Sequence, residues 1–332
     1  VYTTYEVSGV VRGSDSGGAV GLAAASETGE SGTVVEITDY AAALREFGEG
    51  NLSALVKVLL ANGAPVVHCC AVSGTDYASA FSALMGVREI RYMVCDSRDA
   101  AIHAALLDAI NGADEESKYR IGVVESGESD RASLISAAAA LNSERMVLVS
   151  HHETDGTAGA VAAAVCGVMA GEDDPALPLN GATLSGLGEI AENFSDSDLT
   201  LLLRCGGTAF ETLGGAVTVV RGITTRTTSG GAADATWREV NTVLIVDEVL
   251  PGIRDTLRAA FARVKNTAQT RGAIRTRVMI ELESYVAKEI IDSYESVTVT
   301  ADADDVTICT VSFGFAVAHG LNIINLSAQI TV

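Results

Sequence analysis

The sequence predicts a chain of two parts, a doubly wound α/β region followed by a C-terminal α+β domain, with a strand at each end. Three observations support this prediction. Short apolar segments alternate with helical segments from residue 33 to about residue 170, as in parallel β-α units whose sheet is covered on both faces. From residue 237 onwards, helical segments precede segments with a period of two. Residues 1–8 and 325–332 alternate like amphipathic strands.

The α/β region is expected to follow a flexible polar linker at residues 13–18. Asp39 is expected to cap the helix that ends at Phe47, and Asn51 the helix that ends at Ala61. Further helices are expected at residues 77–84, 98–110, 130–141 and 156–170, and strands at 34–37, 66–72, 90–94, 120–125 and 146–149. Residues 199–203 and 217–220 either extend this sheet or begin the next unit.

The C-terminal third is expected to contain two helices and then strands. Pro251 would lie in the first turn of the first helix, where a proline is tolerated. Apolar residues recur at helical spacing in both helices: Ile253, Leu257, Phe261 and Val264, then Ile274, Val278, Leu282 and Tyr285. After Tyr294 the apolar period becomes two, which indicates strands.

Composition excludes several classes of protein. Hydrophobic residues make up 48% of 332 residues, enough for a sizeable core, but no apolar run is long enough to span a membrane. The net charge of −21 argues against binding to nucleic acid. The six cysteines include no Cys-x-x-Cys pair, so we interpret them as small core residues in a reducing compartment. The adjacent Cys69 and Cys70 would point to opposite faces of a strand.

Motifs of nucleotide and acyl chemistry are missing from the sequence. It contains no phosphate-binding loop of the Walker type, no Gly-x-Gly-x-x-Gly between a strand and a helix, and no Gly-x-Ser-x-Gly. We therefore expect no enzyme and no cofactor. Ser126 and the Ser150–His151 pair lie where strands end, which is where α/β folds bind ligands. An α/β enzyme with its site near Ser126 and His151 remains the alternative.

Two polar segments contain side chains that can bind metal ions. The segment from His151 to Asp155 offers imidazole and carboxylate groups, but consecutive side chains diverge, so a strand-to-helix loop in which Asp155 caps the next helix is favoured. Asp302, Asp304 and Asp305 lack the glycine and the distal Glu of a calcium loop, and a turn between two strands is expected there. We expect no metal ion at either segment.

One basic cluster stands out in this acidic chain. Residues 251–278 carry a net charge of +6. The basic residues are Arg254, Arg258, Arg263, Lys265, Arg271, Arg275 and Arg277. Arg254, Arg258 and Lys265 have the spacing of a single helical stripe. Such a stripe indicates either a solvated helix face or a surface that binds an acidic partner.

The terminal strands are a second indication of assembly, because an amphipathic strand promotes aggregation unless another strand pairs with it. The apolar-facing sets are Val1, Thr3, Tyr5 and Val7 at one end, and Leu326, Ala328, Ile330 and Val332 at the other. Each strand either pairs within its own subunit or is donated to a neighbour. The glycine-rich linker favours donation for the N-terminal strand.

Several separated blocks resemble the tail sheath proteins of contractile bacteriophages, which also occur in tail-like bacteriocins and contractile injection systems. The blocks are GAADATWREVNTVLIVDEVLPGIR (231–254), FARVKN (261–266), SFGFAVAH (312–319), NSERMVLV (142–149) and the 160–187 stretch. The resemblance implies an arm and linker at 1–20, an α/β region at 21–220, a sheath core domain at 221–320 and a C-terminal arm at 321–332.

The resemblance also implies a function. Sheath subunits polymerise helically around an inner tail tube, joined by extended arms. They relax without nucleotide from a metastable extended state to a shorter, wider one when the baseplate triggers them. It implies as partners other copies of the chain, the tube protein, and the baseplate and tail terminator proteins. It implies that Arg254, Arg258, Arg263, Lys265, Arg271 and Arg275 face the tube. The location implied is a virion tail or secreted tail-like particle, assembled in the bacterial cytoplasm. Another self-assembling tail component is the alternative within this class of structural proteins.

Overall fold

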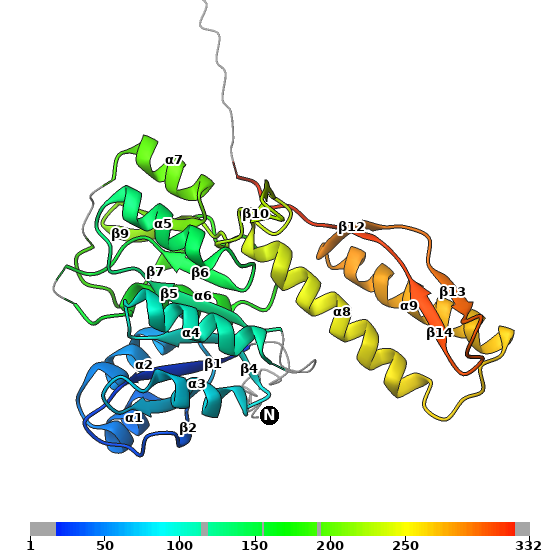
Figure 1. Ribbon diagram of the computed structural model, residues 1–332, viewed down its shortest axis with the longest axis horizontal. Coiled ribbons are helices and arrows are strands. Elements are labelled where there is room, and N and C mark those ends of the chain that lie inside the picture. Colours follow the sequence, from blue (N-terminus) through cyan, green and yellow to red (C-terminus); the bar gives the residue numbers. More distant parts are fainter. Residues whose placement is uncertain (1–17, 114–118, 155, 191–193, 323–332) are drawn as a thin grey trace, which may run out of the picture.

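A computed structural model describes residues 18–113, 119–154, 156–190 and 194–322 (Figure 1). The chain folds into a body built on a nine-stranded sheet and an elongated domain built on two long helices. This arrangement confirms the predicted combination of a doubly wound α/β region with a C-terminal α+β domain. In the described residues, no helix is both long and apolar enough to cross a bilayer.

The sheet of the body is parallel in its centre and antiparallel at its margins. The spatial order is β2 (Val34–Ile37), β3 (Val67–Val72), β1 (Ala19–Ala25), β4 (Ile90–Cys95), β5 (Ile121–Glu125), β6 (Met146–Val149), β8 (Gly207–Leu213), β9 (Ala216–Arg221) and β7 (Thr183–Leu184). Strands from β3 to β8 run parallel, while β2, β9 and β7 each pair antiparallel. The sequence analysis did not predict β1, although it lies between β3 and β4.

Helices cover both faces of the sheet, and alternate residues of each strand enter different cores. On one face lie α1 (Tyr40–Phe47), α2 (Asn51–Ala61) and α6 (Ala160–Gly171), packed on Val20 and Leu22. On the other lie α3 (Tyr77–Met85), α4 (Ala100–Asn111) and α5 (Arg131–Leu141), packed on Ala23. Cys69 and Cys70 enter opposite cores, as predicted.

Local capping explains where the predictions for helices succeed and fail. Asp39 caps α1 by accepting a hydrogen bond from Ala42 N at 2.8 Å, as predicted. Asn51 is not a cap, because its side chain instead donates to Asp96 Oδ2 at 2.6 Å. The extension of the sheet considered at 199–203 is wrong. That segment belongs to α7 (Asp196–Arg204), which a capping box of Ser195 and Asp198 initiates.

Helix α8 (Val240–Ala260) connects the body with the elongated domain. Pro251 lies in its interior, so the prediction of a helix beginning at Pro251 is wrong. A proline leaves the carbonyl four residues earlier without its helical donor. Here that carbonyl belongs to Asp247, and Arg91 Nη2 from β4 donates to it at 3.4 Å. A side chain of the body thus compensates the interrupted helix.

The elongated domain packs α8 and α9 (Ala268–Ala287) against a two-stranded ribbon. The ribbon consists of β12 (Ile291–Tyr294) paired with β15 (Phe315–Val317) and β13 (Thr298–Ala301) paired with β14 (Cys309–Ser312). Between the two pairs, Glu295 N donates to Gly314 O at 2.8 Å. A short hairpin, β10 (Thr228–Ser229) with β11 (Ala232–Ala233), precedes α8.

Helix α8 contributes to two cores. Val240 and Val243 belong to a core of the body, whereas Ile245, Val249 and Ile253 belong to the core of the elongated domain. Body and domain are therefore joined by one continuous helix rather than by a loop. The domain limits given above remain a prediction.

Candidate functional site

The strand ends near His151 have a filled interior rather than an open site. The His151 ring lies edge-on between Phe194 and Phe210, with ring centres 5.2 and 5.5 Å away, and is 5% exposed. Ser150 Oγ donates to Thr208 O at 2.8 Å. His151 Nδ1 lies 2.9 Å from Ser150 Oγ. Ser150 Oγ thus lies between the imidazole and a backbone carbonyl in the buried interior.

The strand end near Ser126 is filled by a carboxylate of the chain itself. Glu125 is fully buried and accepts hydrogen bonds from Gly159 N at 3.1 Å, Val161 N at 2.9 Å and Arg98 Nε at 2.7 Å. The two amides belong to the N-terminal end of α6, the position at which α/β folds bind anionic ligands. Burial raises the pKa of Glu125, and the nearby guanidinium opposes that shift. The internal carboxylate thus takes the place of a phosphate.

The polar segments considered for metals are accounted for by local contacts. Glu153 accepts a hydrogen bond from Gly188 N, and Asp155 lies outside the described residues. In the turn between β13 and β14, Asp302 Oδ1 accepts from the amides of Asp304 and Asp305 at 2.9 Å each, as expected for a turn. These hydrogen bonds lower the pKa of Asp302. In the described part of the chain, no three side chains of His, Cys, Asp or Glu are grouped as metal ligands.

The basic cluster is divided by the structure into two groups. Helix α8 ends at Ala260, so Lys265 lies in the connection to α9 and the single helical stripe does not form. Within the chain, Arg254 lies 5.7 Å from the centre of the Tyr119 ring, Arg271 donates to Asn266 Oδ1 and Arg275 donates to Val297 O. Arg277 pairs with Glu281 at 2.8 Å.

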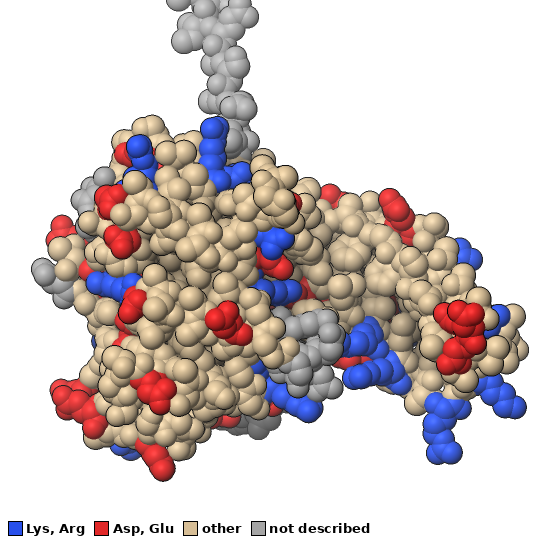
Figure 2. Space-filling view, viewed as in Figure 1, with Lys and Arg blue, Asp and Glu red and all other residues tan. Residues whose placement is uncertain are grey.

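The remaining cations lie at the far end of the elongated domain, and we call residues 258–265 the basic tip. Arg258, Arg263 and Lys265 are exposed there, and none forms an ion pair with another described residue. Figure 2 shows Lys and Arg side chains projecting along this end of the molecule. Val264 lies between two of the cations and is 51% exposed. The basic tip therefore combines positive charge with an exposed aliphatic side chain.

The ribbon offers backbone groups for pairing. Among the described residues, each of its strands pairs with one neighbour only, so both long edges are unpaired. Unpaired edges of this kind are templates for an added strand. All eight residues of the predicted arms lie outside the described residues: Val1, Thr3, Tyr5, Val7, Leu326, Ala328, Ile330 and Val332.

Comparisons with known proteins agree with this geometry. The family described as phage tail sheath C-terminal domain matches residues 232–331. This part of the chain therefore resembles a sheath C-terminal domain. The match covers all of α8, α9 and the ribbon. Curated protein sequences give no match.

Solved sheath proteins share the fold of the whole chain. A sheath tail protein from Desulfitobacterium hafniense aligns with a TM-score of 0.72 and 13% identity, covering 96% of this chain and 100% of that one. The helical sheath of the anti-feeding prophage in its contracted state gives 0.74 and 14%, covering 99% and 98%. The contracted PVC sheath of an extracellular contractile injection system gives 0.69 and 14%, covering 100% and 99%. The predicted resemblance to sheath proteins is confirmed.

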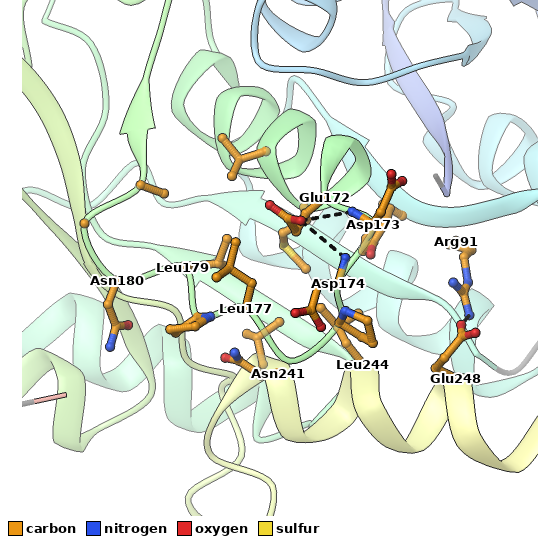
Figure 3. A pocket seen from close by; sticks show the side chains of 18 residues that line it. Arg91, Glu172, Asp173, Asp174, Leu177, Leu179, Asn180, Asn241, Leu244 and Glu248 are labelled. Carbon is orange, nitrogen blue, oxygen red and sulfur yellow. Dashed lines mark hydrogen bonds and ion pairs between the residues drawn. The ribbon is translucent and has the colours of Figure 1, made fainter. Parts of the chain in front are cut away.

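Next to the sheath C-terminal domain lies a cleft that the sequence analysis did not predict (Figure 3). It has a volume of about 340 Å³ and lies between the end of α6, residues 172–182 and α8. Its acidic side chains are Glu172, Asp173, Asp174 and Glu248, and its apolar ones include Leu177, Leu179 and Leu244. The signal in the sequence is the acidic run at 172–174, followed closely by Leu177, which is 53% exposed.

Proposed function

We propose that this chain is the structural subunit of a contractile tail sheath. The observation that carries the proposal is the ribbon of the sheath C-terminal domain, whose two edges are unpaired in the described chain. A strand from a neighbouring copy can pair with each edge through backbone hydrogen bonds, which adds no requirement for a particular side chain. The terminal strands 1–7 and 326–332 are the donors in this proposal, and each links one subunit to another.

Strand donation produces an open polymer. A contact in which the arm of one copy meets the ribbon of the next joins two different surfaces, and such heterologous contacts give rings or helices. The contracted sheaths of the anti-feeding prophage and the PVC system share the fold of this chain, which supports a helical polymer. Partners in this proposal are other copies of the chain, an inner tail tube, a baseplate and a tail terminator. The polymer forms in the bacterial cytoplasm as part of a phage tail or tail-like particle.

Contraction in this proposal moves whole subunits while the arms stay paired. Helix α8 spans both cores, and the buried Asp247 pairs with Arg145 of the body, so body and domain are held as one rigid unit. The free energy comes from better packing in the contracted state, since no nucleotide is required. The strand ends at Glu125 and His151, where the enzyme alternative places its site, are filled by side chains of the described chain, which supports the structural function.

The basic tip is the surface proposed to face the tube in the extended state. Arg258, Arg263 and Lys265 are exposed and carry their charge toward solvent, whereas Arg254, Arg271 and Arg275 have partners within the chain. An acidic tube surface would attract the first group more strongly, because exposed cations are free to form new ion pairs. Arg254, Arg271 and Arg275 contribute to the positive electrostatic potential, but each would have to break its present contact to form an ion pair with the tube.

Electron microscopy of the purified chain tests the proposal directly. The protein is concentrated in moderate salt and negatively stained. Long tubes or stacked rings with helical order are expected. Particles of one small size at every concentration, with or without an added tube, would contradict a sheath function.

A further inference from the structure

The acidic cleft and the basic tip are complementary in charge and in apolar character. The cleft presents Glu172, Asp173 and Asp174, which form no ion pair with any described residue. The only described contacts of the Glu172 carboxylate are the amides of Asp173 and Asp174, at 3.1 and 3.3 Å (Figure 3). The basic tip presents Arg263 and Lys265 on either side of Val264.

The apolar parts of the two surfaces also correspond. Leu177 and Val264 are each about half exposed, at 53% and 51%, although burial of an aliphatic side chain is favourable. Leu179, Leu244 and Met169 line the same cleft as Leu177, so an aliphatic side chain entering the cleft can meet apolar side chains. The cleft has a volume of about 340 Å³.

One copy of the chain cannot bring its own tip to its own cleft. Leu244 lines the cleft and Ala260 ends α8, and the helix between them rises about 24 Å at 1.5 Å per residue. The helix is straight enough in Figure 1 to hold its two ends apart. The cleft and the tip of one copy are therefore available to two different neighbours.

We propose that the acidic cleft of one subunit receives the Arg263–Val264–Lys265 segment of a second copy of this chain. Val264 packs on Leu177 and the other apolar side chains of the cleft, and the flanking cations pair with Glu172, Asp173 and Asp174. The contact is head to tail, so it repeats along the polymer as the arms do. It adds a side-chain contact to the backbone pairing of the proposed sheath, and rests on that function only in requiring a repeating arrangement of copies.

The contact excludes the tube from the same tip. Two of the cations proposed to face the tube are the ones that enter the cleft, so one tip serves one partner at a time. In a sheath that widens on contraction the tip moves away from the tube and becomes available to the cleft. Chains assembled without a tube are expected to show the contact, and they are the material for the test.

Site-specific cross-linking tests the contact. Cys205 and Cys309, the two cysteines that are not fully buried, are replaced by serine, and Leu177→Cys is combined with Val264→Cys. Under a mild oxidant this chain is expected to form a ladder of covalent oligomers, at least tenfold more than a control with Leu213→Cys and Val264→Cys. Leu213 is 56% exposed, lies at the end of β8 and is not among the residues that line the cleft. Equal cross-linking in the two chains would overturn the proposal.

Charge exchange provides a second, independent measurement. Asp173→Lys with Asp174→Lys, or Arg263→Glu with Lys265→Glu, is expected to raise the concentration needed for assembly at least tenfold. All four changes in one chain are expected to restore it to within threefold of the original. The contact would be overturned if both double variants assembled like the unaltered chain, or if the variant with all four changes did not recover assembly. Absence of tubes from the unaltered chain, with or without an added tube protein, would instead refute the sheath function, and the cross-link would still report on the contact in whatever oligomer forms.

Discussion

Arg145 and Asp247 form a two-point ion pair that ties the body to the middle of α8. Arg145 Nη2 donates to Asp247 Oδ1 at 2.9 Å, and Nη1 donates to the second carboxylate oxygen. Arg145 directly precedes β6, and the Asp247 side chain is 3% exposed. Next to it, Arg91 of β4 pairs with Glu248 at 3.3 Å, but both of those side chains are more than a third exposed. Both ion pairs, Arg145–Asp247 and Arg91–Glu248, connect the body to α8, but only the first is buried.

Removing Asp247 is expected to destabilise the chain much more than removing Glu248. Asp247→Ala leaves a largely buried guanidinium without its partner, which typically costs about 3–5 kcal/mol. Glu248→Ala removes an exposed ion pair and is expected to cost about 1 kcal/mol or less. Urea unfolding followed by circular dichroism measures both. Equal losses would show that the buried pair does not hold α8 to the body.

The buried His103 is expected to make stability fall as the solution becomes acidic. His103 Nε2 lies 2.8 Å from Ser97 O, so the neutral ring donates this hydrogen bond. Burial lowers the pKa of His103 below its ordinary value of 6.5. The unfolded chain therefore binds the proton more readily, and the free energy of unfolding decreases as the pH falls from about 6.5 toward the folded pKa.

His103→Gln isolates this effect, because it keeps a donor but does not titrate. Between pH 7 and pH 5 the variant is expected to lose less stability than the unaltered chain in matched chemical unfolding. His319→Gln, at an exposed histidine, serves as the control and is expected to follow the unaltered chain. Parallel curves for the unaltered chain and His103→Gln would contradict the assignment to His103.

Deleting either arm is expected to abolish the polymer without unfolding the subunit. Chains lacking residues 1–12 or 323–332 retain every described strand and helix, so their circular dichroism and melting temperature should match those of the full chain. Replacement of 323–332 by a Gly/Ser segment of equal length is the control that separates strand pairing from mere length. Tubes that survive both deletions in electron micrographs would refute strand donation.

Reversal of the exposed cations is expected to weaken binding to the tube more than reversal of the engaged ones. Arg258→Glu with Arg263→Glu is compared with Arg271→Glu with Arg275→Glu, which changes the net charge by the same amount. The difference is expected to be largest at low salt, because the screening length is about 10 Å at 0.1 M and grows as salt is removed. Co-sedimentation with the tube protein measures it. Identical binding by the two variants would assign the basic tip to another partner.

Changes at the strand ends are expected to leave assembly intact. Ser126→Ala removes a hydroxyl whose oxygen accepts from Glu128 N at 3.2 Å, and His151→Ala empties the space between Phe194 and Phe210. The second change is expected to cost roughly 1–3 kcal/mol of stability through the cavity alone, yet tubes should still form below the melting temperature. A chain that forms no tubes and whose catalytic activity disappears in His151→Ala would favour the enzyme alternative.

Short-range patterns were enough to predict much of the α/β region. The strands predicted at 34–37 and 146–149 match β2 and β6 residue for residue. β6 is a fully buried strand of a sheet covered on both faces, and such strands are short apolar runs. β2 lies at the edge of the sheet and includes the exposed Glu36. The Asp39 cap and the alternation of Cys69 and Cys70 were predicted from equally local patterns. The motif search likewise predicted no nucleotide chemistry, and the sheath resemblance rested on blocks that were read directly from the chain.

Other features depend on residues that are distant in sequence. β1 (Ala19–Ala25) consists mostly of Ala and Gly, with Val20 and Leu22, and becomes a central strand only because β3 and β4 pair with it on either side. α8 begins at Val240 and continues through Pro251. The body buries its first turns, and Arg91 donates a hydrogen bond to the Asp247 carbonyl that Pro251 leaves without a helical donor. Local propensity cannot predict either the pairing of β1 or the contact of Arg91 with α8, because both depend on residues distant in sequence.

The sequence by itself determined the fold class, the excess of positive charge at 251–278 and the likeness to sheath proteins. Only the tertiary structure decided which of those cations have partners within the chain. Arg254, Arg271 and Arg275 contact Tyr119, Asn266 and Val297. Arg258, Arg263 and Lys265 form no ion pair with a described residue. The acidic cleft likewise exists only after α6, residues 172–182 and α8 come together. Periodicity reports the environment of a residue along its own element, but contacts between elements are set by packing of the whole chain.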